Sequence, residues 1–209
     1  GALFSITEKK FGASALNLPT GSTGAYAEIT TPIEVGLDNV SNSYSISVWF
    51  KRLYDYTNGW RTLTRGSGSN HQVIVSNGND RLGSFLSSDG GFQDSGHDLH
   101  PEISQNSWQH LAATFDGSST KFYLDGSNAG TVNKSAGNNI FAVGNRQGGN
   151  QRFAEYIDDF RVYGISLSGD EVASIYNSGN GDLPDSNDSL LLGGEMSLSA
   201  SPYLTALTA

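Results

Sequence analysis

Three acidic side chains, Glu155, Asp158 and Asp159, lie close enough in the sequence to be considered for glycosidase chemistry. Hydrolysis of a glycosidic bond requires two carboxyl groups on either side of the bond, about 5 to 10 Å apart. The apolar residues around these acids predict a strand over residues 153–163 that closes the fold. The position of that strand therefore decides whether the acids could face a substrate.

A second cluster combines histidines and acids, the side chains that commonly bind metal ions. It consists of His97, Asp98, His100 and Glu102. Their spacing matches no regular zinc motif, and the surrounding segment is polar and rich in glycine. This pattern predicts a solvated loop rather than a metal site. In such a loop His97 and His100 are candidates for contact with a ligand.

Aromatic side chains gather in one connecting segment together with polar neighbours. Tyr54, Tyr56 and Trp60 stand there, with Asp55 and Asn58 between them. Sugar rings present apolar C–H faces to aromatic rings, while polar side chains bind their hydroxyl groups. The segment is therefore the best candidate in the sequence for contact with a glycan. The alternative is that these rings pack within the fold, with Trp60 at the start of the next strand.

A second polar segment follows the aromatic one at a distance and is interrupted by glycines. Its planar side chains could pair with hydroxyl, carboxylate or sulfate groups, and its glycines would let the backbone approach a partner. The alternative is a solvated hairpin loop. The candidate residues are Asn145, Arg146, Gln147, Asn150, Gln151 and Arg152.

Three cationic or titratable side chains fall in strands that are predicted to be adjacent. Arg65, His71 and Arg81 could form a cationic stripe on one face of a sheet. A stripe of this kind would suit an acidic polysaccharide. Isolated exposed charges are equally ordinary, so this alternative stays open.

The composition favours an all-β fold that positions these groups. The chain has 209 residues, 26 of them glycine and only one of them methionine. Glycine together with abundant Ser, Asn and Thr favours many turns between short strands. The length suits one large all-β domain with a sizeable core.

Short strands are predicted along most of the chain. Residues 45–50 alternate strictly and place Ile46, Val48 and Phe50 on one face. Asp125 and Gly126 supply the positive φ angles of a tight hairpin between residues 120–125 and 127–132. The other predicted strands are residues 13–18, 26–30, 60–65, 71–76, 81–86, 108–115, 139–144 and 153–163. So many short strands predict a two-sheet antiparallel β-sandwich.

One short helix is predicted near the end of the domain. Ser168 and Glu171 form a capping box, apolar residues follow at helical spacing, and Gly179 is the predicted stop. We therefore divide the chain into a domain over residues 1–178 and a linker and C-terminal tail over residues 179–209. The tail could pair with a sheet edge or with a second chain, which would make a homo-oligomer.

Charge and cysteine content narrow the classes of partner. The formal net charge is −9, from 21 acids against 12 bases. This balance disfavours nucleic acid and anionic membrane surfaces, which require clustered Lys and Arg. The chain has no cysteine and no run of about 18 apolar residues. We expect an exported bacterial module at the cell surface or outside the cell, without membrane insertion.

Four sequence blocks carry a resemblance to a known family. They are FGASALNL (residues 11–18), YSISVWFK (44–51), NSWQHLAATFDGSSTKFYLDG (106–126) and YIDDFRVYGISLSGDEVASIY (156–176). Together they resemble the laminin-G-like jelly rolls of the concanavalin A-like lectin and glucanase superfamily. The resemblance implies two stacked antiparallel sheets with a concave and a convex face, in modules that bind glycans or proteins.

The resemblance also implies a role for Asp158. In a regular strand Asp158 shares a face with Tyr156, Phe160 and Val162, so it would enter the core with them. A buried carboxylate needs a cation or several donors. In relatives the Asp at this position contributes to a structural calcium site completed by backbone carbonyls from the N-terminal region. The alternative is that Asp158 meets an arginine or backbone amides.

Catalytic relatives place their carboxylates on one strand as Glu-x-Asp-x-x-Glu, and the chain has no such motif. Glu155, Asp158 and Asp159 lie in the closing strand instead, and a third acid is missing. We therefore expect no enzyme activity but a carbohydrate-binding or adhesion module that recognises a glycan or polysaccharide. The alternatives are a protein-binding or self-associating adhesin domain and, with less support, an atypical polysaccharide hydrolase or lyase.

Overall fold

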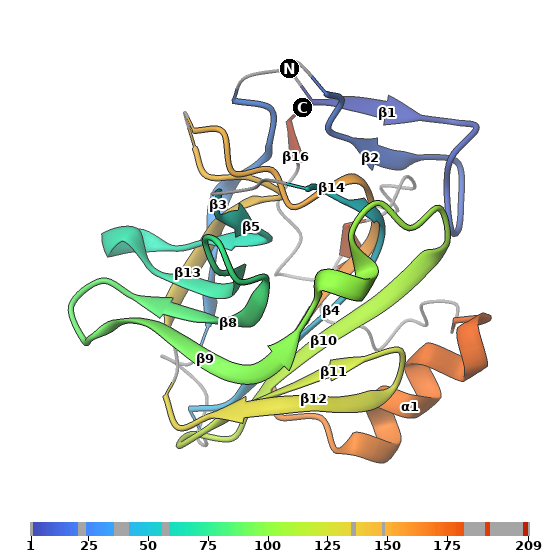
Figure 1. Cartoon of the computed structure of the whole chain (residues 1–209). Coiled ribbons are helices and arrows are strands. Elements are labelled where there is room, and N and C mark those ends of the chain that lie inside the picture. Colours follow the sequence, from blue (N-terminus) through green and yellow to red (C-terminus); the bar gives the residue numbers. More distant parts are fainter. Residues whose placement is uncertain are drawn as a thin grey trace.

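Two layers of antiparallel strands enclose the apolar core of the protein (Figure 1). The structure is a computed structural model, and it describes residues 2–20, 24–35, 42–55, 59–134, 137–147, 149–181, 191–192 and 207–208. The predicted all-β, antiparallel sandwich with a single short α-helix near the C-terminal end is confirmed.

The first layer is an eight-stranded sheet in the order β1-β2-β14-β4-β10-β11-β12, in which β15 also pairs with β14. Its strands are β1 (Leu3–Ser5), β2 (Ala15–Asn17), β4 (Tyr44–Leu53), β10 (Trp108–Phe115), β11 (Thr120–Leu124), β12 (Ser127–Val132), β14 (Ala154–Tyr163) and β15 (Leu191–Leu192).

The second layer consists of two four-stranded sheets, β16-β3-β13-β6 and β5-β7-β8-β9. They are joined where β5 and β6 follow each other along the chain, because Leu63 between them donates its N–H to Val73 O at 3.2 Å. The strands are β3 (Ala27–Val35), β5 (Arg61–Thr62), β6 (Thr64–Arg65), β7 (His71–Val75), β8 (Arg81–Leu86), β9 (Gly91–Asp98), β13 (Asn138–Val143) and β16 (Leu207–Thr208).

The core lies between the layers and is built by alternation along the strands. In β4, Ile46, Val48 and Phe50 face the core, as their alternation predicts, and they meet Leu63 and Val73 from the second layer. Trp49 and the serines of β4 face the other side, where they are also buried. The eight-stranded sheet is therefore covered on both faces near β4.

A β-bulge in β14 changes the face on which its acids lie. Asp159 has a φ of 48°, and the pairing with β4 shifts between Asp158 and Arg161. The extra residue places Phe160 in the core and Asp158 on the opposite face, across from Trp49. The prediction that Asp158 shares a face with Phe160 and Val162 was therefore wrong, because a period-two pattern cannot anticipate an inserted residue.

The hairpin and the helix follow their local sequence signals. Asp125 and Gly126 have φ values of 47° and 74°, as the tight turn between β11 and β12 requires. In α1 (Gly169–Tyr176) Ser168 and Glu171 form the predicted capping box. The helix ends earlier than predicted, because Asn177 already adopts a left-handed conformation two residues before Gly179, which is also left-handed.

Helix α1 covers the outer face of the eight-stranded sheet (Figure 1). Val172 and Ile175 pack there against Tyr123 and Tyr163. The short 3-10 helices span Ser67–Ser69, His100–Glu102 and Asn177–Gly179. No helix within the described residues has the length and apolarity needed to cross a membrane.

Strand β9 was not predicted, because the sequence around His97 indicated a loop. Its residues are polar apart from Phe92 and two glycines, and within β9 only Ser95 is buried. The strand is instead held by backbone pairing with β8 and by a 3.1 Å bond from Ser95 Oγ to Ala129 O at β12. An edge strand that buries so little apolar surface leaves no alternating pattern in the sequence.

The described part of the tail pairs with strands of the same chain. Leu191 and Leu192 pair with β14, and Leu207 and Thr208 pair with β3. Pairing with a sheet edge was one of the two expected outcomes for this segment. Its role in an oligomer stays a prediction, as does the division into residues 1–178 and 179–209.

Candidate functional site

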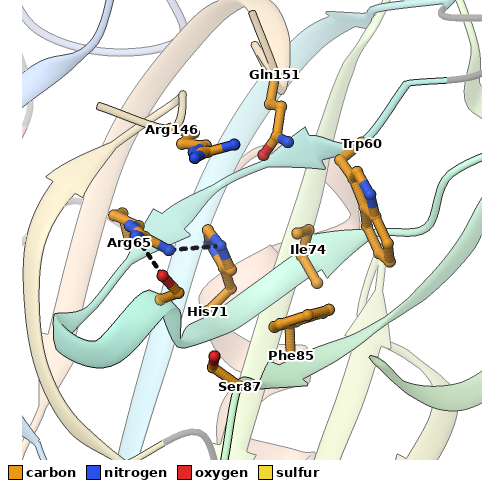
Figure 2. Close-up of a pocket in the computed structure, with 9 residues that line it drawn as sticks. Trp60, Arg65, His71, Ile74, Phe85, Ser87, Arg146 and Gln151 are labelled. Carbon is orange, nitrogen blue, oxygen red and sulfur yellow. Dashed lines mark hydrogen bonds between the residues drawn. The ribbon is translucent and has the colours of Figure 1, made fainter. Parts of the chain in front are cut away.

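A pocket of about 280 Å³ lies on the outer face of the second layer, over β7 and β8 (Figure 2). It brings together five of the residues that the sequence selects as ligand contacts, although these come from three separate segments. The lining residues are Trp60, Arg65, Ser69, His71, Ile74, Phe85, Ser87, Arg146 and Gln151.

The strands of the second layer determine which side chains reach this pocket. Val73 and Val75 of β7 face the core. A register shift between His71 and Ile74 allows both of these residues to face the pocket instead. Phe85 of β8 pairs directly with His71, so its ring lies beside the imidazole, with 6.0 Å between ring centroids.

Two aromatic rings, those of Trp60 and Phe85, form one wall of the pocket, and the ring of Phe92 packs against Trp60. The Trp60 ring centroid lies 5.5 Å from those of both Phe85 and Phe92, with interplanar angles of 83° and 62°. Gly83 makes this packing feasible, because a Cβ there would stand 2.0 Å from Gln93 O and 2.9 Å from the Phe92 ring. We call Trp60 and Phe85 the aromatic wall.

His71 and Arg65 form a fixed polar pair on the other side of the pocket. His71 Nδ1 lies 2.8 Å from Thr64 O, which can only accept, so Nδ1 carries the hydrogen. Nε2 is therefore an acceptor, and Arg65 Nη1 donates to it at 3.1 Å. Arg65 Nη2 also donates to Ser69 Oγ at 3.0 Å. The guanidinium group is thereby held by neutral acceptors.

Burial keeps the imidazole neutral near pH 7. Burial lowers the pKa of His71 to about 4, and the charges of Arg65 and Arg146 act in the same direction. Burial also lowers the pKa of the Arg65 guanidinium, again with a contribution from Arg146. The nine described residues that line the pocket include no Asp or Glu.

The loop that follows β13 carries two further pocket residues, Arg146 and Gln151. Asn145 is fully buried beneath them. Its Nδ2 donates to Ala25 O and Gly149 O at 2.9 and 3.1 Å, and its Oδ1 accepts from Gln151 N at 2.8 Å. Gln151 is also held by Thr62, whose Oγ1 donates to Gln151 Oε1 at 3.0 Å. Asn145 thus supports the loop and does not face the pocket.

Two other predicted contact residues, Tyr54 and Arg152, also lie below the surface. The Tyr54 hydroxyl donates to Leu18 O, and the Arg152 guanidinium stands 4.7 Å from the centre of the Tyr54 ring. Arg152 also donates to Pro19 O. Both residues hold the chain together beneath the pocket layer, which is the packing alternative considered for the aromatic segment. Tyr56 lies outside the described residues.

The remaining predicted contacts lie away from the pocket. His97 is on edge strand β9, and exposed His100 faces Asp80 with 3.1 Å between Nδ1 and Oδ2. Arg81 is drawn to β9 by Asp94 Oδ2, at 3.5 Å from its Nε. Of the three residues predicted to form a cationic stripe, Arg65 and His71 line the pocket and Arg81 does not, and His71 is neutral near pH 7.

Sequence reasoning missed four lining residues, Ser69, Ile74, Phe85 and Ser87. Phe85 could have been found, because Leu82 and Leu86 of β8 alternate with it and face inward. Ile74 could not, since its side depends on the register shift in β7.

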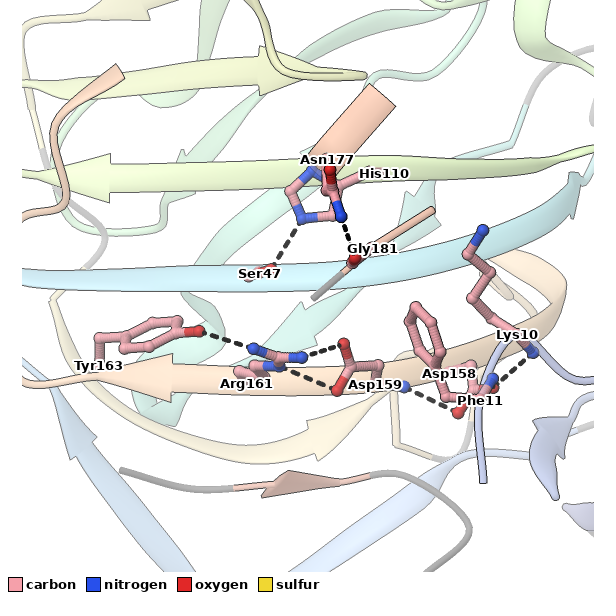
Figure 3. A network of polar contacts seen from close by, with 10 residues as sticks. All are labelled: Lys10, Phe11, Ser47, His110, Asp158, Asp159, Arg161, Tyr163, Asn177 and Gly181. Carbon is pink, nitrogen blue, oxygen red and sulfur yellow. Dashed lines mark hydrogen bonds and ion pairs between the residues drawn. The ribbon is translucent and has the colours of Figure 1, made fainter. Parts of the chain in front are cut away.

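Asp158 meets backbone amides, which is the alternative to calcium considered for this residue (Figure 3). Its Oδ2 accepts from Lys10 N at 2.7 Å and Phe11 N at 3.0 Å, and its Oδ1 accepts from Asp159 N at 2.9 Å. Burial raises the pKa of Asp158, while these three bonds oppose the rise.

Calcium requires several oxygen ligands, whereas the N-terminal segment turns N–H groups toward this carboxylate. The residues around Asp158 therefore do not fit a calcium site. Among the described residues, no group of three or more His, Cys, Asp or Glu side chains could hold a metal. Calcium binding by the chain stays a prediction.

The other two acids of the cluster in β14 are engaged in ion pairs. Glu155 Oε2 lies 3.1 Å from Arg52 Nη1. Asp159 forms a two-bond pair with Arg161, at 2.9 Å from Nε and 2.8 Å from Nη2 (Figure 3). Each acid of β14 thus has a structural partner, and none lines the pocket.

Comparison with known proteins gives one family model, which is described as the concanavalin A-like lectin/glucanases superfamily and matches residues 21–173. A sequence search of curated proteins gave no match.

Several solved structures share the fold. Domain 4 of AbnA, an extracellular arabinanase from Geobacillus stearothermophilus in complex with arabinotriose, is 24% identical with a TM-score of 0.56. The alignment covers 83% of this chain and 80% of that one. A heptameric SAP-like pentraxin from Limulus polyphemus is 16% identical with a TM-score of 0.55, covering 91% and 90%. The receptor-binding domain of botulinum neurotoxin type G is 16% identical with a TM-score of 0.51, covering 84% and 44%.

Proposed function

The chain belongs to the concanavalin A-like lectin/glucanases superfamily, and on that basis we propose that it is a non-catalytic carbohydrate-binding module of a secreted or surface protein. The family membership agrees with the resemblance seen in the four sequence blocks. We further propose that the pocket over β7 and β8 is the glycan site.

The observation that carries the proposal is the aromatic wall inside a polar pocket. Trp60 and Phe85 present ring surface to the pocket, while Gln151 and Arg146 reach it from the loop that follows β13 (Figure 2). Apolar C–H faces of a sugar stack on such rings, and its hydroxyl groups bind amide and guanidinium groups. A wall and polar groups that converge on one small volume are what a sugar residue requires.

The chemistry of the lining favours binding over hydrolysis. A glycosidase needs two carboxyl groups beside the bond, and none of the described lining residues supplies one. The acids of β14 are paired with arginine or with backbone amides instead. This arrangement supports a module that holds a glycan without cleaving it.

The arabinanase domain lends support of a limited kind, because its structure contains arabinotriose and it belongs to an extracellular enzyme. At 24% identity the likeness establishes the fold alone. The sugar bound by the present chain therefore has to come from experiment.

A glycan array on the purified protein tests the proposal, followed by titration calorimetry with the best hit. We expect saturable binding that Trp60→Ala weakens by about tenfold or more, since stacking of a ring on an aromatic side chain contributes on the order of 1 kcal/mol or more. Trp108→Ala is the matched control, because Trp108 begins β10 and does not line the pocket. An array without a hit from folded protein would contradict the proposal, as would equal weakening by the two variants.

A second candidate function is self-association through the tail, in a protein-binding or adhesive module. The observation that favours it is that the two described tail strands add to β14 and β3 by backbone pairing. Strands β14 and β3 could pair in the same way with the tail of a second copy of the chain. Light scattering of the full chain and of a variant ending at residue 181 distinguishes the candidates, because equal monomer masses would rule out tail exchange.

A further inference from the structure

Two guanidinium groups face the pocket without an acidic partner. Arg65 is bonded to His71 Nε2 and Ser69 Oγ, which are neutral acceptors. Arg146 is exposed at its rim. Neither arginine forms an ion pair with any of the described residues.

Most of the other arginines of the protein are neutralised by carboxylates, in contrast to this pair. Four of them have carboxylate partners: Arg52 with Glu155, Arg61 with Asp80, Arg81 with Asp94, and Arg161 with Asp159. Acids are also abundant, because the chain has 21 acids for 12 bases. The chain therefore has enough carboxylates to neutralise these arginines, but none of the described residues that line the pocket is an acid.

The two charges act on each other on the same side of the pocket. The charge of Arg146 lowers the pKa of the Arg65 guanidinium, in addition to the larger effect of burial. Both effects disfavour the charged form, and an anion bound between the two groups would relieve them. Arg65 is prepared for such a partner, because its bonds to His71 and Ser69 fix its orientation in advance.

We infer that the glycan carries an acidic group, a carboxylate or a sulfate, that binds between Arg65 and Arg146 while its sugar ring lies against Trp60 and Phe85. The inference rests on the proposed function. Figure 2 shows the two arginines on one side of the pocket and Trp60 on the other. His71 is a positioning residue, because its neutral Nε2 accepts from Arg65.

The size and surroundings of the pocket specify the ligand further. Its volume of about 280 Å³ lies near the lower end of ligand pockets. This suits one acidic sugar residue within a chain or at its end. A densely charged polymer is disfavoured, because the protein as a whole has a net charge of −9 and would repel it.

Matched glycans test the inference. An oligosaccharide that carries one uronic acid residue is compared with its carboxyl-reduced form, and an oligosaccharide that carries one sulfate with its desulfated form. We expect binding to one acidic member at least about tenfold tighter than to its neutral partner. Raising the salt concentration from about 50 to about 500 mM should weaken the acidic complex alone. The member that binds identifies carboxylate or sulfate as the acidic group.

Arg146→Gln is the decisive variant, since Arg146 is exposed and its side chain forms no hydrogen bond or ion pair with another described residue. It should weaken binding of the acidic glycan about tenfold more than binding of the neutral one, because only the acidic glycan loses an ion pair. Arg81→Gln is the matched control, because it removes the same charge from an arginine of β8 that is paired with Asp94. We expect it to leave both affinities within about twofold.

The failures of the two proposals differ. Equal binding of acidic and neutral glycans, unchanged by Arg146→Gln, overturns the inference and leaves the proposed function intact. Equal weakening by Arg81→Gln and Arg146→Gln also overturns it, because net charge would then explain the effect. If no glycan binds to the folded protein, both are overturned.

Discussion

Arg161 and Arg65 stand on opposite faces of the sandwich and differ in how their charges are treated. Arg161 is fully buried, and its guanidinium group donates two hydrogen bonds of 2.9 and 2.8 Å to the carboxylate of Asp159 (Figure 3). Arg65 is only partly buried, and its partners in the pocket are a neutral histidine and a serine. We call the outer face of the eight-stranded sheet around Arg161 the covered region. There an acid of the same chain neutralises the buried arginine, whereas in the pocket no described acid neutralises Arg65.

The difference follows from what lies above each sheet. Helix α1 and the N-terminal segment cover the outer face of the eight-stranded sheet, so water cannot solvate a charge there. The face over β7 and β8 opens into the pocket. A charge in a closed layer must be paired during folding, while one in an open pocket remains available to a ligand. The contrast separates arginines that hold the fold from those that recognise a partner.

The largest expected effect comes from breaking the covered pair with Asp159→Asn. Asparagine tolerates the φ of 48° at this bulge, so the variant removes the charge without straining the backbone. It removes the carboxylate charge that neutralises the buried Arg161, which should lower the free energy of unfolding by about 3 to 5 kcal/mol. Chemical denaturation measures the loss. Arg146→Gln in the pocket is the control and should stay within about 0.5 kcal/mol. Equal losses in both variants would abolish the distinction between the regions.

The next effect concerns acid, because each region contains one buried histidine. Burial lowers the pKa of His71 to about 4 and that of His110 to about 3, with smaller contributions from neighbouring cations. The unfolded chain takes up these protons near pH 6.5, before the folded protein does. Stability is therefore complete above about pH 6.5 and falls as the pH drops toward the folded pKa values, by up to about 1.4 kcal/mol per pH unit for each histidine.

Denaturation at pH 6.5 and 4.5 in His71→Gln and His110→Gln separates the two contributions. Each variant should lose about 2 kcal/mol less between these pH values than the unchanged protein does. A bound acidic glycan should reduce the His71 contribution alone, because an anion favours the protonated imidazole. An identical pH dependence in all three proteins would mean that neither imidazole is held neutral.

The fold was predictable wherever local pattern and tertiary structure agree. The alternation of β4, the Asp125–Gly126 turn and the Ser168–Glu171 capping box each involve neighbours in sequence, and all three were predicted. The bulge at Asp159 and strand β9 were not. Both depend on pairing with another strand, which residue spacing does not encode.

The site was predictable only as scattered candidates. Arg65, His71, Arg146 and Gln151 were selected for their side chains, but nothing in the sequence shows that they meet in one pocket. Asn145 and Arg152 have equally suitable chemistry and are buried as supports. Polar type alone cannot distinguish a contact from a support, because the distinction depends on which way each loop residue turns.

The smallest expected effect concerns metal and tests whether the covered region is complete without one. Both oxygens of Asp158 accept backbone N–H groups, so replacing calcium by a chelator should change the melting temperature by less than about 1 °C. Asp158→Asn should be destabilising to the same degree in calcium and in chelator. If a chelator lowers the melting temperature and Asp158→Asn abolishes this decrease, then calcium binds at this carboxylate. The backbone at Lys10 and Phe11 would then have to turn carbonyls toward the ion. The covered region would then bind an ion from outside the chain, as we propose for the pocket. The two regions would differ only in the sign of that ion, which is a cation in the covered region and an anion in the pocket.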